Sequence, residues 1–144
     1  MFRFAVLFAV AIFLPATFSV GAWAESKWEI VGSSKDKNES RYVDVNSIHR
    51  DGDHVYFWIL TDFATPPPEL ASAGFKGFTY HIQGDCLSLG HKYLEILAFP
   101  LQMGKGESKK LPVSDHLNSW NYAVPDSMQH KAVKSMCNFT KNKK

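Results

Sequence analysis

Two cysteines, Cys86 and Cys137, fall in segments of different hydrophobic periodicity, and a bond between them would restrict the fold more than any other feature. Residues 75–86 alternate apolar and polar side chains, as a strand with one buried face does, and Cys86 has the parity of the apolar set. Cys137 follows Val133 by four residues in a stripe of helical spacing. A disulfide would therefore hold a C-terminal helix on a sheet, and the chain-entropy model gives it about 4 kcal/mol of stabilisation.

The first 24 residues indicate whether such a bond can form. Arg3 supplies a positive charge, and residues 4–14 are an unbroken apolar run. Ala22 and Ala24 place small side chains at the two positions that a signal peptidase reads. Residues 1–24 are therefore predicted to be a secretory signal peptide that sends the chain out of the cytoplasm.

A retained membrane anchor is the alternative interpretation of this segment. A spanning helix needs about 20 predominantly apolar residues, and Pro15 and several polar or small residues interrupt the second half. We therefore expect cleavage, no stable membrane insertion afterwards, and one domain over residues 25–144. In an oxidising compartment, an even cysteine count predicts one disulfide, Cys86–Cys137.

The charge balance bears on the class of partner. The chain has 16 basic and 14 acidic residues, without the cationic excess that a nucleic-acid binder needs, so no nucleic-acid partner is expected. Five lysines gather near the C-terminus: Lys131, Lys134, Lys141, Lys143 and Lys144. We interpret them as a solvated tail, and a patch for acidic glycans or anionic surfaces is the alternative.

Six segments have the composition of strands: residues 28–31, 41–45, 54–63, 75–86, 91–99 and 120–124. The third carries apolar side chains on both faces, which predicts a central strand covered on each side. Asp51 and Gly52 indicate the tip of a hairpin between the second and third segments. Residues 64–74 contain three prolines, and residues 102–112 contain two glycines and several charges, so both are predicted loops, the second with a loose hairpin as an alternative.

One helix is predicted after Pro125, with Asp126 or Ser127 as its N-terminal cap. Its apolar stripe consists of Met128, Ala132, Val133, Met136 and Cys137. The opposite side is expected to carry Gln129, His130, Lys131 and Lys134.

The sequence holds no motif for hydrolysis, phosphate binding or zinc binding, so we assign no catalytic residue, no metal site and no cofactor. Six histidines are expected to be solvent-exposed rather than ligands of a metal or haem: His49, His54, His81, His91, His116 and His130. His81 and Asp85 share a strand face, but four residues of strand span about 13 Å, too far to hold one ion. A dispersed hydrolytic site built from such residues stays as an alternative.

The tryptophans Trp28, Trp58 and Trp120 lie in strand-like segments and are predicted to belong to the core. The alternative is a recognition surface made by exposed aromatic residues of segment 75–80 or of the proline loop.

A series of landmarks occurs along the chain in a characteristic order. They are Trp28, Tyr42-Val43-Asp44, Ser47-Ile48, Gly52, Val55-Tyr56-Phe57-Trp58 with Leu60, Asp85-Cys86, Met103-Gly104-Lys105-Gly106, Trp120, Pro125-Asp126-Ser127 and Cys137. In this order they resemble the bacterial surface-adhesin protein E-like family over nearly all of the chain after the signal. One departure is Asp126, where the family more often has glycine before the serine.

This resemblance implies an α+β fold with an antiparallel sheet and a disulfide-tethered C-terminal helix, which agrees with the pattern of about five to six strands and one helix. It also implies a bacterial source and adhesion to host matrix proteins. We therefore expect an exported, non-enzymatic binding module, a surface adhesin for matrix-type protein ligands. The alternatives are a small periplasmic hydrolase and a periplasmic structural or accessory protein. The expected location is the periplasm, or the cell surface or medium after secretion, and no feature of the sequence indicates an oligomeric state.

Overall fold

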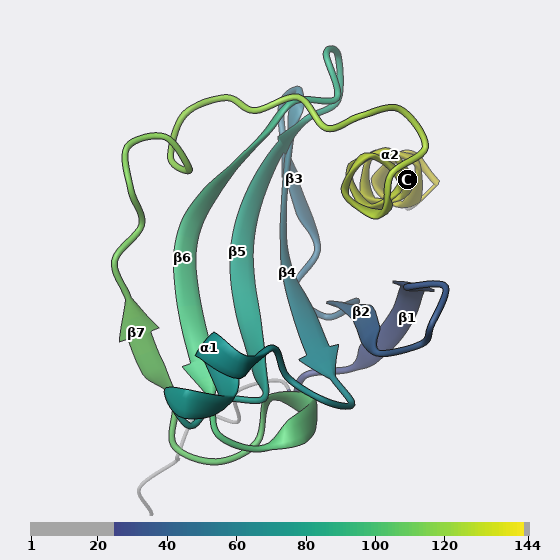
Figure 1. Ribbon diagram of the computed structural model, residues 1–144. Helices are drawn as coiled ribbons and strands as arrows, with labels where there is room; N and C mark the ends of the chain where they lie inside the picture. The colour runs from purple at the N-terminus through teal and green to yellow at the C-terminus, as the bar shows by residue number, and fades with distance from the viewer. Residues whose placement is uncertain (1–24, 143–144) are drawn as a thin grey trace, which may run out of the picture.

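The computed structural model describes residues 25–142, which form a curved antiparallel sheet with a long helix across part of one face (Figure 1). The predicted signal peptide, residues 1–24, lies outside the described residues, as do residues 143 and 144. The strands are β1 (Trp28–Ser33), β2 (Glu39–Asp44), β3 (His49–Asp51), β4 (His54–Phe63), β5 (Gly77–Asp85), β6 (His91–Phe99) and β7 (Lys109–Leu111). The helical elements are α1 (Pro68–Ser72), a 3₁₀ turn η1 (Gln102–Gly104) and α2 (Met128–Lys141).

The sheet has the order β1-β2-β4-β5-β6-β7, and β3 also pairs with β4. Every pairing is antiparallel. The predicted α+β fold is therefore confirmed, with seven strands in the described part of the chain. The strand count exceeds the expected five to six because β3 and β7, of three residues each, come from segments that were predicted as turn and loop.

The predicted hairpin tip is confirmed at Gly52, which joins β3 to β4 and has φ +56°. Glycine suits this position because the left-handed conformation carries no steric cost for it. The first arm of the hairpin is β3 rather than the whole of the earlier strand. A turn, in which the Ser47 N–H donates to the Asp44 carbonyl over 3.0 Å, separates β2 from β3. Both strands nevertheless pair with β4.

The core lies between the sheet and α2, where side chains of one parity on β4 and β5 meet the stripe of the helix. Its members include Val55, Phe57, Ile59, Ile82, Ala132, Val133 and Met136. The sheet and the helix approach so closely that a Cβ on Gly84 would lie 3.0 Å from Cγ1 of Val133. Because burial of apolar surface is the main favourable contribution to folding, this face supplies most of the stability.

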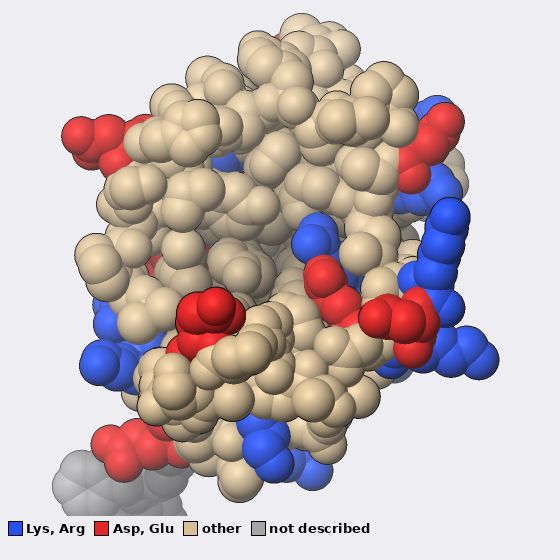
Figure 2. Space-filling view, viewed as in Figure 1, with Lys and Arg blue, Asp and Glu red and all other residues tan. Residues whose placement is uncertain are grey.

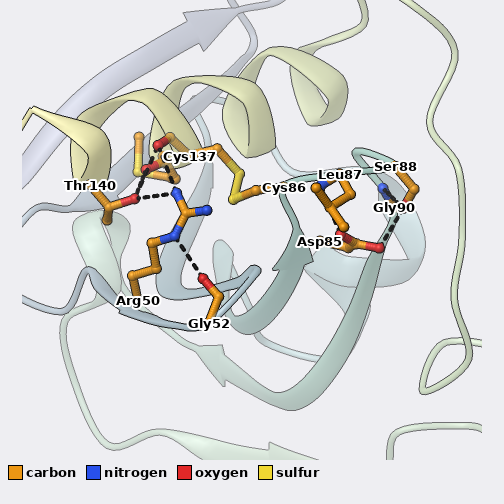
Figure 3. Close-up of a disulfide and its surroundings, with 10 residues drawn as sticks. Arg50, Gly52, Asp85, Cys86, Leu87, Ser88, Gly90, Cys137 and Thr140 are labelled. Atoms are coloured by element: carbon orange, nitrogen blue, oxygen red, sulfur yellow. Dashed lines mark hydrogen bonds between the residues drawn. A yellow bond between two sulfur atoms is a disulfide. The ribbon is translucent and has the colours of Figure 1, made fainter.

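The C-terminal helix forms as predicted. Ser127 is its N-cap, and the hydroxyl oxygen accepts a hydrogen bond from the His130 N–H over 3.3 Å. The buried stripe is Ala132, Val133, Met136 and Cys137. The expected disulfide is also present, since Cys86 and Cys137 are bonded with their Cα atoms 5.6 Å apart (Figure 3). It joins the end of β5 to the last turns of α2.

Arg50 of β3 makes a second connection to the same end of the helix (Figure 3). Its Nε donates to the Gly52 carbonyl over 2.9 Å, and its Nη1 donates over 3.5 Å to the Cys137 carbonyl and the Thr140 hydroxyl. A cation near a helix C-terminus also interacts favourably with the helix dipole. The hairpin and the disulfide thus hold the helix from two sides.

The structure explains why aspartate can replace the family's usual glycine at position 126. This residue has φ +63°, a left-handed conformation that glycine adopts without strain. Aspartate is among the few other residues that tolerate it. The turn before the helix is kept, and the Asp126 N–H donates to Nδ1 of His130 over 3.2 Å.

Among residues 25–142, only one end of the opposite face of the sheet is covered. The turn η1 lies against Leu60, which is fully buried, and is held there by the Met103 N–H, which donates to the Asp62 carboxylate over 2.9 Å. Tyr56 and Trp58, nearer the hairpin, stay partly exposed. The prediction that β4 is covered on both faces is therefore correct at Leu60 and wrong at its other end.

Two loop predictions need refinement and one strand prediction is wrong. The proline loop contains the short helix α1, and segment 102–112 contains η1 and β7. Segment 120–124 makes only an isolated bridge, between Asn121 and His91. Tyr122 and Val124 are 68% and 74% exposed, so this segment buries too little apolar surface to form a strand of the core.

Candidate functional site

The face of the sheet that points away from α2 carries a set of ring side chains that contact one another. The set consists of His49, His54, Tyr56, Trp58, His81 and Trp120, and we call it the ring face. Five of them come from β3, β4 and β5, and the sixth comes from the segment between β7 and α2. Alternation along β4 places these rings opposite the buried core residues.

Strand register brings four of the rings into one continuous stack. His49 is the cross-strand partner of Tyr56, and their rings are parallel with centroids 4.9 Å apart. Trp58 is the partner of His81, again stacked at 4.9 Å. Tyr56 and His81 lie 6.4 Å apart at a tilt and connect the two pairs. Cross-strand ring pairs of this kind stabilise a sheet and hold each ring in one orientation.

A second group of rings extends the face toward the hairpin tip. Trp120 stacks on His54 with centroids 5.6 Å apart, and the Lys92 ammonium lies 5.0 Å from the Trp120 ring centroid. Trp120 is 38% exposed. The prediction that this tryptophan belongs to the core is therefore wrong, because its segment lies over the end of the sheet instead of inside it.

The electrostatics favour an uncharged His81 at the centre of the stack at neutral pH. Burial lowers the pKa of His81 below the ordinary histidine value, so its ring is neutral at pH 7. His81 is also the cross-strand partner of Glu95, whose carboxylate pairs with Lys110 over 3.4 Å. The charged groups of Glu95 and Lys110 therefore lie at the border of the ring face.

A groove of about 710 Å³ continues from the ring face along the same side of the sheet. Trp58 belongs to both. Other apolar residues of the groove are Trp28, Leu97, Phe99 and Met103. Together the rings and the groove form a half-exposed aromatic surface on rigid strands, which can stack on or enclose apolar and aromatic groups of a partner.

The six histidines predicted to be exposed differ in their burial. His49 and His116 are exposed, whereas His91 is only 5% exposed, so the prediction is wrong for His91. It starts β6 beneath Asn121, with which it exchanges two backbone hydrogen bonds. Within residues 25–142, no group of three or more histidine, cysteine or acidic side chains is arranged to hold a metal ion.

Asp85, which was considered as a partner of His81, serves the turn that follows β5. Its carboxylate accepts hydrogen bonds from the Leu87 N–H over 2.8 Å and from the Ser88 hydroxyl over 2.7 Å (Figure 3). The bond from Leu87 contributes most to lowering the pKa of Asp85. The structure therefore brings His81 together with aromatic rings, not with this carboxylate.

The alternative prediction placed an exposed aromatic surface in segment 75–80 or in the proline loop, but the ring face lies elsewhere. Phe78 and Tyr80 point to the α2 side of the sheet, where they line a cavity. The ring face was missed because Trp58 was assigned to the core and the histidines were considered one at a time. The signal was the shared parity of His54, Tyr56 and Trp58, but only the register between strands shows which rings meet.

Among the C-terminal lysines, Lys131, Lys134 and Lys141 are exposed on α2. The remaining two, Lys143 and Lys144, lie outside the described residues. No helix in the described part of the chain is long and apolar enough to cross a membrane.

Comparison with known proteins gives a match to one family model. No curated protein matches the sequence significantly. The family model of surface-adhesin protein E matches residues 28–138, from the first residue of β1 to the last turns of α2. The disulfide and this match together indicate an exported protein with a binding role. The chain therefore belongs to the surface-adhesin protein E family.

Proposed function

We propose that this protein is an exported, non-enzymatic surface adhesin that holds a matrix-type protein partner on its ring face. The observation that carries the proposal is the stack of His49, Tyr56, His81 and Trp58, which stays partly exposed on rigid strands. Membership of the adhesin family supports a binding role.

The chemistry of the ring face suits a protein ligand. Tyrosine and tryptophan are enriched where binding energy concentrates, because each offers a large rigid surface with one polar group. The rings are already fixed by one another, so little side-chain freedom is lost on binding. Lys92, Glu95 and Lys110 supply mixed charges at the border, where they can guide the register of a partner.

Binding of the purified exported protein to a panel of immobilised extracellular-matrix proteins tests this proposal. We expect saturable binding to at least one of them. Tyr56→Ala should weaken it by about tenfold or more, because it removes the ring that links both stacked pairs. The affinity should change little across a salt series, since stacking contacts are screened less than exposed ion pairs.

Tyr122→Ala is the matched control, because Tyr122 is an exposed tyrosine outside the ring face. It should bind as the unaltered protein does. Failure to bind any matrix protein, or equal losses for the two tyrosine variants, would reject the ring face as the adhesive surface. Protease accessibility on intact cells separates surface display from a periplasmic location: an adhesin must be cleaved, and a periplasmic accessory protein is protected.

A further inference from the structure

The side of the sheet that carries α2 is not completely filled by the helix. A cavity of about 440 Å³ opens beside it, and Figure 2 shows the molecule hollowed over its middle strands, with charged side chains next to the hollow. The apolar wall includes Ile59, Phe63, Phe78, Tyr80, Tyr93 and Ile96. The volume lies within the range of small-molecule sites.

Gln129, at the start of α2, gives this cavity an unpaired hydrogen-bond donor. Helix periodicity predicted Gln129 on the solvent side, but it lies four residues before Val133 and its half-buried side chain lines the cavity. Its Oε1 accepts from Nη1 of Arg41 over 3.3 Å. Arginine has donors only, so the amide oxygen must face Arg41 and the Nε2 group must face elsewhere. That Nε2 is buried and has no partner within residues 25–142.

The charge in the cavity is already balanced. Nε of Arg41 donates to Oε1 of Glu39 over 2.8 Å, and both side chains are about one-quarter exposed. An anionic ligand would place a second negative charge beside Glu39 in this partly desolvated site, which is unfavourable. A neutral hydrogen-bond acceptor avoids that cost.

The two tyrosines of the wall add donors of the same kind. Tyr80 and Tyr93 meet edge to face with centroids 5.3 Å apart. Burial raises the pKa of Tyr80 to about 12, and burial also raises the pKa of Tyr93, so both hydroxyls keep their protons at neutral pH. Among the described residues, neither hydroxyl has a hydrogen-bond partner. A buried amide N–H without a partner is unfavourable, and a ligand acceptor would remove that cost.

We propose that this cavity binds a small neutral molecule with an aromatic body and a carbonyl oxygen, the oxygen accepting from Gln129 Nε2 and the body lying against Phe78, Tyr80 and Tyr93. The site lies on the opposite side of the sheet from the ring face. It therefore does not depend on the proposed adhesive function, and each proposal can fail alone.

The experiment titrates the whole exported protein with Prodan, a naphthalene ketone whose emission reports the polarity around it. We expect a saturable blue shift. Gln129→Leu removes the donor and keeps a good helix former, and it should weaken Prodan binding by about five- to tenfold. Tyr122→Phe, away from the cavity wall, should bind as the unaltered protein does.

Thermal unfolding of each variant shows that it is folded, and Tyr80→Phe provides a second variant that keeps the ring of the wall. No saturable shift with the unaltered protein would overturn the proposal, as would equal Prodan affinity for the unaltered protein and both cavity variants. An anionic comparison probe, 8-anilinonaphthalene-1-sulfonate, should bind more weakly than Prodan. Tighter binding of this probe that depends on Gln129 would overturn the assignment to a neutral ligand.

Discussion

The two faces of the sheet use neighbouring residues of β4 for different purposes. Phe57 points under α2 and is fully buried, whereas Tyr56 and Trp58 on either side of it point to the ring face and stay partly exposed. The covered face removes apolar surface from water and holds the helix. The ring face carries aromatic side chains that lie outside the core. The difference predicts that stability and the proposed binding can be altered separately along a single strand.

The largest expected effect comes from the covered face. Phe57→Ala removes a fully buried ring and leaves a cavity, so the free energy of unfolding should fall by about 3–5 kcal/mol. Tyr56→Ala, next to it on the ring face, should cost clearly less because its side chain is partly exposed. Urea unfolding of both variants measures this. Equal losses would show that the two faces contribute equally to stability.

The next effect concerns the bond that holds the helix to the covered face. Replacing Cys86 and Cys137 together by alanine opens a loop with a sequence separation of 51 residues. The free energy of unfolding should fall by about 2–4 kcal/mol. The same loss should follow reduction of the unaltered protein, measured by urea unfolding with and without a thiol. If neither treatment changes the midpoint, the contacts of α2 alone hold it in place.

An intermediate effect is expected from acid. Burial lowers the pKa values of His81 and His91 in the folded protein, so the unfolded chain binds protons more readily. Their contribution to stability is complete above the ordinary histidine pKa of about 6.5 and is lost as the pH falls below it.

The melting temperature should therefore decrease between neutral pH and about pH 5, and His81→Gln with His91→Gln should make this dependence shallower. A dependence as steep in the double variant as in the unaltered protein would assign it to other groups. His91 belongs to the buried set and His81 to the ring face, so the single variants also separate the two faces.

Much of the covered face could be predicted from the sequence, because periodicity reports burial directly. The parity of Cys86 and the helical spacing of Val133 and Cys137 both indicated one buried face, and the disulfide joins them as expected. The end of β6 at Phe99, as predicted, and the cap at Ser127, one of the two expected caps, follow from local chemistry. These features depend on short stretches of chain.

The ring face and the cavity could not be predicted in the same way, because they depend on register and on segments distant in sequence. His81 meets Trp58 only because of the pairing between β4 and β5. Arg41 meets Gln129 across 88 positions of sequence. Trp120 contacts His54 although its own segment is not a strand of the sheet. Periodicity gives the face of each side chain but not its neighbours.

The central claim is that the ring face recognises the partner while the covered face supplies stability. Trp58→Ala and Phe57→Leu test it most directly, because these neighbours on β4 face opposite sides. Both the free energy of unfolding and the affinity for the matrix protein should be measured on the same preparations. We predict that Trp58→Ala loses about 30-fold in affinity or more while it stays folded, and that Phe57→Leu loses stability but keeps its affinity. Unchanged affinity in folded Trp58→Ala would contradict the account.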